Sequence, residues 1–400
     1  MTTIVETPTG AAQTMVLNMG PQHPSTHGVL RVILELNGEI VVKAEPIIGY
    51  LHTGIEKSCE AKTYSQAITL TDRIDYLAPL SNNLGYCLAV EKLLGIEVPK
   101  RAQYTRVLLT ELTRITSHLV WLGTHAIDLG AMSVFLYTFR EREEIMKIFE
   151  YVSGQRMMTS YFRIGGLALE PPPGFLDKVR RVMDALPGHV DEYEDLLTNN
   201  RIWLGRTQGV GIISADDAIA MGCSGPMLRG SGVAYDVRKA FPYSSYDEFN
   251  FDVQTQTAGD CFARYQVRVA EIRESIKIVR QAMERVAKAD GPIRTEAPGI
   301  IPPSREEMKT SIEGLIYHFK IYTEGFAPPP GEVYQVIESP RGELGFFVAS
   351  DGSAKPYRVK VRAPSFVNLQ SLPTLAVGRL IADVVACIGT TDIVLGEVDR

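Results

Sequence analysis

The sequence predicts an α+β fold, with a mainly helical core, an N-terminal β-hairpin and a small C-terminal antiparallel sheet. Three observations support this prediction. Apolar residues recur every three or four positions through long segments in the middle of the chain, as in amphipathic helices. Near both ends, short runs alternate apolar and polar residues between turn-forming pairs, as strands do. Strands and helices do not alternate as βαβ units, so no parallel sheet is expected.

The first part of the chain is expected to contain a short extension and a β-hairpin. Residues 1–14 are small and polar and resemble no signal peptide, so they are expected to be a flexible extension. Residues 15–400 are expected to form one domain that starts with a hairpin region, 15–54. There we expect strands over 15–19, 30–36 and 39–47, with Asn37–Gly38 as a two-residue turn.

The helical core is expected to span residues 55–300. Its expected helices cover 55–70, 80–94, 104–151, 175–186 with a second to 197, and 258–288. The last of these has the clearest apolar stripe, which indicates core packing: Phe262, Tyr265, Val269, Ile272, Ile276, Val279, Met283 and Val286. Ile115–Phe139 is nearly uncharged but contains His118, His125 and Asp128, so we expect a buried helix broken near Gly123 or Gly130, with no membrane span.

The C-terminal part is expected to follow a proline-rich connection over residues 292–303. A β-meander is expected within 330–364, with strands over 332–339, 343–350 and 356–363. Residues 371–400 are expected to form a C-terminal helix, 372–388, and an extended tail, 390–400.

The composition excludes several functional classes. The 400 residues are 45% hydrophobic and 22% charged, which is ordinary for a globular protein. The net charge of −6 argues against a nucleic-acid partner. The five cysteines include no CxxC pair, so neither a disulfide framework nor a cysteine-based metal site is predicted, and a reducing compartment is favoured. Phosphate-loop and dinucleotide motifs are absent, so no nucleotide site is predicted, and the sequence contains no zinc-hydrolase or EF-hand motif.

The segment Gly20–Gly28 is the first candidate site because it holds His23 and His27 between two expected strands. Two imidazoles on a short loop suit proton donation, ligand hydrogen bonding or metal binding. The alternative is an ordinary turn whose histidines bond nearby backbone.

Two further candidates are Asp128 and Tyr76. His125 and Asp128 are three residues apart and share a helix face, and a carboxylate in so apolar a run needs a partner. That partner could be His125 or a loop histidine such as His27, and such a pair could relay a proton. The alternative is a structural polar bridge. Tyr76 could donate a hydrogen bond to a carbonyl and lend a proton. Alternatively, it is an ordinary amphipathic tyrosine.

A series of short motifs makes the chain resemble a known family. They occur at residues 20–31, 72–76 (DRIDY), 124–132 (THAIDLGAM), 152–156 (VSGQR), 236–239 (DVRK), 259–265 (GDCFARY) and 389–400. In this order they resemble the D subunit of bacterial NADH:quinone oxidoreductase, which forms the quinone pocket of respiratory complex I. The resemblance covers residues 15–400.

The resemblance implies a fold like that of the large subunit of nickel–iron hydrogenases. In those enzymes two cysteine pairs hold the metal centre. Here Asp75, Ala78, Val394 and Glu397 stand where the thiolates are expected. Without these soft ligands the chain is expected to bind no metal. The vacated site would instead take a quinone headgroup.

The resemblance also implies roles for the candidate residues. Tyr76 would hydrogen-bond one side of the quinone, and His27, with His23 less directly, would serve the other. Asp128 would pair with His27 and return its proton. Electrons would come from a 4Fe–4S cluster in the iron–sulfur B subunit of the complex, so this chain would bind no cofactor and would not be active alone.

The remaining implications concern partners and location. The iron–sulfur B subunit, the C subunit and the membrane-arm subunits where quinone enters would be neighbours, on the cytoplasmic side of the bacterial inner membrane, in a proton-translocating complex. The chain would be peripheral, without a transmembrane segment.

Three positions are expected near the partner's cluster, namely Arg73, Thr53 and Met158. Many relatives have Arg and His at the last two, so their absence here implies a lower, less pH-dependent cluster potential and a menaquinone substrate. The alternatives are a non-catalytic assembly scaffold and a nickel–iron hydrogenase large subunit. The missing cysteine pairs argue against the latter.

Overall fold

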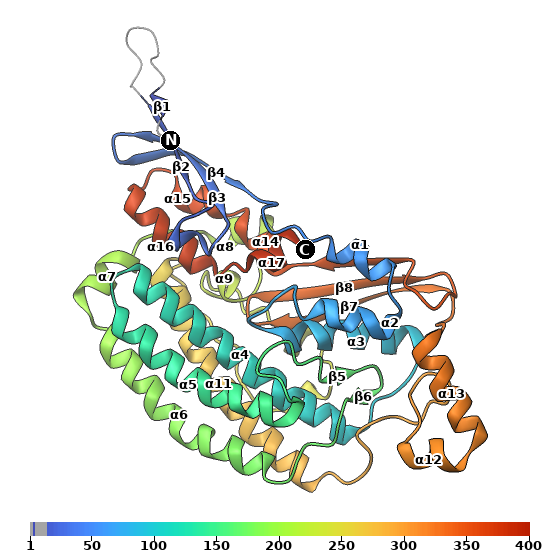
Figure 1. Ribbon diagram of the computed structural model, residues 1–400. Coiled ribbons are helices and arrows are strands. Elements are labelled where there is room, and N and C mark those ends of the chain that lie inside the picture. Colours follow the sequence, from blue (N-terminus) through green and yellow to red (C-terminus); the bar gives the residue numbers. More distant parts are fainter. Residues whose placement is uncertain (1–2, 5–13) are drawn as a thin grey trace.

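The computed structural model describes residues 3–4 and 14–400 and begins with an antiparallel sheet (Figure 1). Its strands pair in chain order: β1 (Thr3–Ile4), β2 (Met15–Met19), β3 (Arg31–Asn37) and β4 (Ile40–Ile47). The flexible extension expected over residues 1–14 falls mostly outside the described residues.

The β3–β4 hairpin is confirmed, but its turn lies one residue later than expected. Asn37 still pairs with Ile40, so Gly38 and Glu39 form the turn. A β-bulge between Glu35 and Leu36 adds a residue to β4 and bends the hairpin. The alternate residues of β3 are buried, which fixes the face that meets the rest of the protein.

Four long helices run side by side (Figure 1). They are α4 (Lys100–Asp128), α5 (Met132–Ser153), α6 (Phe175–Leu197) and α11 (Cys261–Lys288). The apolar stripe expected on α11 lies in the core, with only Phe262 partly exposed. The helix expected over 80–94 is also confirmed as α3 (Pro79–Leu94), which ends at Gly95.

Two helix boundaries differ from the expectation, and one expected break is confirmed. The segment 55–70 is two helices, α1 (Ile55–Glu60) and α2 (Tyr64–Thr71), because Thr63 caps the second with a capping box. The long region 104–151 is broken at Gly130, whose φ is +94°, as expected of a break near Gly123 or Gly130. In contrast, α6 continues through Pro187, because its apolar stripe stays buried on both sides of the proline.

Short elements connect these helices, and most were not expected. They are α7 (Arg201–Thr207), α8 (Ala215–Ala220), α9 (Pro226–Arg229), α10 (Val237–Ala240), α12 (Arg305–Thr310), α13 (Ile312–Thr323), β5 (Phe162–Arg163), β6 (Gly166–Leu167) and 3₁₀ turns at Pro24–Thr26 and Tyr246–Glu248.

The expected meander is confirmed as β7 (Gly331–Ser339), β8 (Gly342–Ser350) and β9 (Arg358–Arg362), paired in this order. Only two residues, Pro340 and Arg341, join β7 to β8. The tip of this hairpin points into the protein, since Arg341 is 1% exposed.

The C-terminal segment differs from the expectation in two places. The helix expected over 372–388 is split into α15 (Leu372–Ala376) and α16 (Ile381–Thr391), because the intervening residues bond to Val41 of β4. The tail is not extended. It forms the end of α16 and α17 (Leu395–Asp399), which packs on α14 (Pro364–Leu369) and is buried.

Two hydrophobic cores result from this arrangement. One lies among the long helices and the meander, and the other between the N-terminal sheet and the C-terminal helices, which lie together in Figure 1. Leu129 and Tyr235 pack against both cores. Within the described part of the chain, no helix combines the length and apolarity needed to cross a bilayer.

Candidate functional site

A buried ionic cluster forms where three distant segments meet. Arg341 at the β7–β8 tip makes an ion pair with Asp75, which lies between α2 and α3. The same guanidinium donates from Nε to the Asp392 carbonyl oxygen at 2.8 Å and from Nη2 to the Asp392 carboxylate at 3.4 Å. Backbone N–H groups of Leu77 and Ala78 also donate to Asp75, at 3.0 and 3.1 Å, and fix its orientation.

Glu397 of α17 completes this cluster. Its Oε2 accepts hydrogen bonds from the backbone and the hydroxyl of Ser365. Burial and the nearby Asp75 raise the pKa of Glu397 to about 7. Burial opposes the charge on Arg341, but Asp392 and Asp75 outweigh that effect and raise its pKa.

This cluster occupies two of the positions where the resemblance expects thiolates, Asp75 and Glu397. Ala78 and Val394, at the other two, are buried and apolar. A carboxylate paired with a guanidinium and a carboxyl bonded to a serine are poor soft-metal donors. The residues present therefore do not fit a nickel–iron centre.

The histidine loop lies over this cluster. The 3₁₀ turn Pro24–Thr26 ends at His27, whose φ of +51° is in the left-handed region. Burial lowers the pKa of His27, Asp392 opposes that change, and Arg341 reinforces it. Both charged groups therefore act on the imidazole. Its buried Nε2 has no hydrogen-bond partner among residues 3–4 and 14–400.

Asp128 does not form the expected pair with His27. It accepts a hydrogen bond from Ser25 Oγ at 3.3 Å, and the Ser25 backbone N–H donates to His23 Nδ1 at 3.2 Å. Ser25 thus links Asp128 to His23, the more exposed of the two loop histidines. Burial raises the pKa of Asp128 to about 6, although the Ser25 hydrogen bond and the charge of His23 oppose this shift.

His125 is not the partner of Asp128 either. Its ring stacks on Trp121 and meets the edge of Trp203, and neither ring nitrogen has a partner among the described residues. Burial and Arg268 lower its pKa to about 3. A Cβ atom on Gly389 would lie only 2.2 Å from His125 Nδ1, so a glycine is required there.

Tyr76 follows Asp75 and is half-buried. Its ring lies 3.4 Å from the point where a Cβ of Gly396 would stand, so α17 packs on it. It lines a cleft with residues of the 156–159 loop. Burial and Asp75 raise the pKa of Tyr76, while Arg341 opposes the shift, so the phenol is protonated at neutral pH. Within the described chain its hydroxyl makes no hydrogen bond.

The three residues expected near the partner's cluster lie near the surface. Arg73 is exposed, and so is Thr53, just before α1. Met158 is half-buried with φ of +54°, in the loop after α5. The Ser160 hydroxyl donates to Asp72, which ties this loop to the segment that carries Arg73.

Sequence reasoning did not single out Arg341, Ser25 or Ser365. Only for Arg341 was a signal present, because it lies in the two-residue turn between two alternating strands. Two other histidines bond residues that are distant in the sequence: His118 Nε2 lies 2.9 Å from the Glu271 carboxylate, and His52 Nδ1 lies 2.7 Å from the Asp399 carbonyl oxygen.

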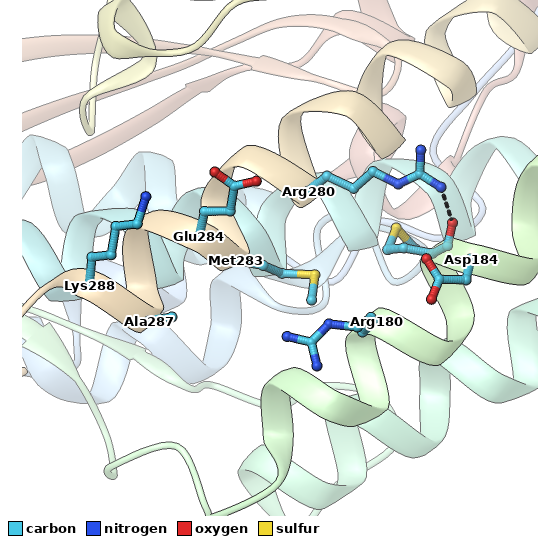
Figure 2. A pocket seen from close by; sticks show the side chains of 8 residues that line it. Arg180, Asp184, Arg280, Met283, Glu284, Ala287 and Lys288 are labelled. Atoms are coloured by element: carbon cyan, nitrogen blue, oxygen red, sulfur yellow. Dashed lines mark hydrogen bonds between the residues drawn. The ribbon is translucent and has the colours of Figure 1, made fainter.

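A separate hollow between α6 and α11 brings none of the expected site residues together. Figure 2 shows its lining of Arg180, Met183, Asp184, Arg280, Met283, Glu284, Ala287 and Lys288. The Arg280 side chain donates to the Met183 carbonyl oxygen at 2.8 Å. Basic and acidic groups mix in this lining, so it offers no single charge to a ligand.

Comparison with known proteins gives consistent matches. The family model of the respiratory-chain NADH dehydrogenase 49 kDa subunit matches residues 128–400. The chain is 66% identical to an NADH-quinone oxidoreductase D subunit (copy 1) of Solibacter usitatus (strain Ellin6076) over 386 residues, 96% of this chain and 94% of the relative. It is 63% identical to the D subunit (copy 2) of Koribacter versatilis (strain Ellin345), over 98% of this chain and 97% of that relative. It is 60% identical to the D subunit of Geotalea uraniireducens (strain Rf4), over 98% of this chain and 100% of that relative.

Proposed function

We propose that this chain forms the quinone-reduction pocket of an NADH-quinone oxidoreductase together with the iron–sulfur B subunit of that complex. The chain belongs to the family of the 49 kDa subunit of respiratory-chain NADH dehydrogenase, and is therefore a subunit of such a complex. One observation carries this proposal. Three buried polar atoms beside Arg341 lack partners in the described chain, namely His27 Nε2, Asp392 Oδ2 and Glu397 Oε1. Such atoms are rare in folded proteins and suit a polar ligand.

The chemistry needs two proton donors at one site. Reduction of a quinone to a quinol takes two electrons and two protons. The electrons would come from the 4Fe–4S cluster of the iron–sulfur partner, so this chain supplies the protons and the shaped site. Neutral Tyr76 would donate a proton to one quinone oxygen, and His27 would donate to the other from its protonated imidazolium form, which burial makes more acidic.

Arg341 serves both donors. Its positive charge opposes the burial effect on Tyr76 and adds to it on His27, so in both cases it favours proton release. Both donors must afterwards regain their protons. Asp128 would act there as a positioning residue, through Ser25 and the more exposed His23.

The proposal includes the surroundings of the chain. The iron–sulfur B subunit, the C subunit and the membrane-arm subunits where quinone enters would be its neighbours, with Arg73, Thr53 and Met158 facing the partner's cluster. The complex would translocate protons, and the chain would be a peripheral subunit on the cytoplasmic side of the inner membrane. The alternative is an assembly scaffold, which would not need the donor set.

A photoreactive quinone tests the proposal directly. When assembled complex in membranes is irradiated with an azidoquinone, we expect label on the tryptic peptides 1–31, 74–92 or 380–400, which hold His27, Tyr76 and Asp392. Excess unmodified quinone should remove this label. Label confined to other subunits of an active complex would favour the scaffold alternative.

Replacing Asp128 with asparagine should lower quinone reductase activity on the order of tenfold, less than loss of a direct proton donor. The carboxyl has a pKa of about 6, so wild-type activity should fall between pH 7 and pH 5 as it becomes protonated. The activity of the Asp128→Asn variant should stay constant across that pH range. Steady-state assays of the pH profile check this.

Loss of stability would not explain such a result. A carboxyl whose pKa is raised by folding stabilises the protein below its unfolded pKa and loses that contribution as pH rises through about 6. At pH 7 asparagine should therefore be tolerated. Asp195→Asn, at an exposed position on α6, is the matched control. Identical pH profiles for both variants and the wild type would exclude a role for Asp128.

A further inference from the structure

Two buried cysteines from distant segments face the same loop. Cys261 is the first residue of α11, and Cys387 lies in α16. A Cβ atom on Gly211 would lie 3.2 Å from the Cys261 sulfur and 3.1 Å from the Cys387 sulfur. The Cys261 sulfur also lies 3.8 Å from the carbonyl oxygen of Ala386, the residue before Cys387. The fold therefore places the two thiols together.

The surroundings of Cys261 favour a thiolate. It sits at the N-terminal end of a 28-residue helix, where the helix dipole is positive. Arg264 Nη2 lies 3.7 Å from its sulfur. Burial opposes ionisation, but the Cys387 thiol and Arg264 outweigh it and lower the pKa of Cys261 to about 7. Reactive cysteines typically have these features.

The other cysteines of the helical core differ. Burial, with Glu56 and Glu60 nearby, raises the pKa of Cys59 to about 12. Burial also raises the pKa of Cys87 to about 12. Neither has a cationic neighbour that outweighs its burial, so the chain contains its own unreactive controls.

We propose that Cys261 and Cys387 form a peroxide-reactive thiol pair, in which a small hydroperoxide oxidises Cys261 and Cys387 closes a disulfide with it. Both thiols are buried, but the loop 208–213 that covers them is exposed at Gln208, Gly209 and Ile212. Gly211 itself contributes no side chain over the sulfurs, and Arg264 Nη2 bridges its carbonyl oxygen, at 2.7 Å, and the Cys261 sulfur, at 3.7 Å. A small oxidant suits this position better than a bulky one.

The reaction balances with one hydroperoxide. The Cys261 thiolate attacks one peroxide oxygen, the O–O bond breaks, and a sulfenic acid forms while the other oxygen leaves with a proton as water or an alcohol. The Cys387 sulfur then attacks the Cys261 sulfur, the S–O bond breaks, and water leaves. In total, the two thiols lose two electrons and form one disulfide, and the peroxide gains these two electrons.

This disulfide would join α11 to the helix that leads into the candidate site. Asp392 directly follows α16, and Arg264 Nε donates to Thr390 Oγ1 of the same helix at 2.9 Å. Oxidation of the pair would therefore act on the position of Asp392. The thiol pair itself does not depend on the proposed quinone site.

Hydrogen peroxide applied to the assembled complex in membranes tests the proposal. After unfolding, alkylation of free thiols and trypsin digestion, we expect one cross-link between peptides 240–264 and 380–400, each of which has a single cysteine. A reducing agent should remove it. Cys59 and Cys87 should remain alkylated thiols at the same dose.

Two variants distinguish the roles of the cysteines. With Cys387→Ser, the cross-link should disappear and a sulfenic-acid trap should label Cys261. With Cys261→Ser, Cys387 should stay a thiol. Oxidation of Cys59 to the same extent as Cys261, or an unmodified Cys261 at doses that inactivate the complex, would overturn the proposal. Because mass spectrometry measures the disulfide, failure of the proposed quinone site would not change this result.

Discussion

Replacing Tyr76 with phenylalanine should lower the quinone reductase activity of the assembled complex by about 10²- to 10³-fold, the usual effect of losing a direct proton donor. The phenol is protonated at neutral pH because burial and Asp75 raise its pKa. Its hydroxyl makes no hydrogen bond within the described chain, so its removal leaves no buried group unpaired. The ring, which packs against α17, is kept. We therefore expect a chemical defect without a folding defect.

Two assays on the same membranes separate these effects. NADH oxidation with a short-chain quinone should collapse, whereas NADH oxidation with an artificial acceptor that takes electrons upstream should stay near wild type. Tyr357→Phe, at a residue that is 69% exposed, is the matched control and should change neither. Normal quinone reduction in Tyr76→Phe would make Tyr76 a packing residue and would favour the scaffold alternative.

The elements that depend on local pattern were predictable from the sequence. The stripe on α11, strand β3 of the hairpin and strand β9 of the meander each bury one face, and a buried face leaves a periodic signal, whereas β8 is buried on both faces. The prediction of an extended C-terminal tail was wrong for the opposite reason. Residues 393–399 are almost all buried, so they show no polar face from which a short helix could be recognised.

The candidate site was predictable only in part. Tyr76 and His27 stood out by residue type and neighbourhood, but the contacts between distant segments did not. Arg341 and Asp75 are 266 residues apart in the chain, and no spacing rule connects them. The predicted partner of Asp128 was wrong for a related reason. The sequence allows either His27 or His125 as the partner, but the turn of the histidine loop brings the Ser25 hydroxyl to Asp128.

The cluster around Arg341 leads to the second large prediction. Replacing Arg341 with methionine should destabilise the chain by about 3–5 kcal/mol, because a buried carboxylate pair would lose its counter-charge. Quinone reduction should also be lost, since Arg341 favours proton release from both Tyr76 and His27. Thermal denaturation of the purified complex and the level of assembled chain in membranes measure the first effect. The two NADH assays measure the second.

The pH dependence of the stability loss in Arg341→Met shows whether the lost charge or the lost packing of Arg341 causes it. In the wild type, burial and Asp75 already raise the pKa of Glu397 to about 7, and Arg341 opposes that shift. Without the guanidinium, the pKa values of Glu397 and Asp75 should rise further. Groups with raised pKa values stabilise the folded chain below their unfolded pKa and lose this contribution as pH rises. The variant should therefore be closest to wild type at pH 6 and fall furthest behind above pH 7.

Arg358→Met is the matched control for this substitution. Arg358 lies on β9, is 45% exposed and pairs with Glu60 at 3.0 Å, so its loss should cost less than about 1 kcal/mol at any pH. Arg341→Lys keeps a positive charge but loses the fork that bonds both Asp75 and Asp392, and should be intermediate. If Arg341→Met were as stable and as active as Arg358→Met, the buried cluster would be neither a stabilising centre nor part of the quinone site. The unpaired atoms of His27, Asp392 and Glu397 would then need another explanation.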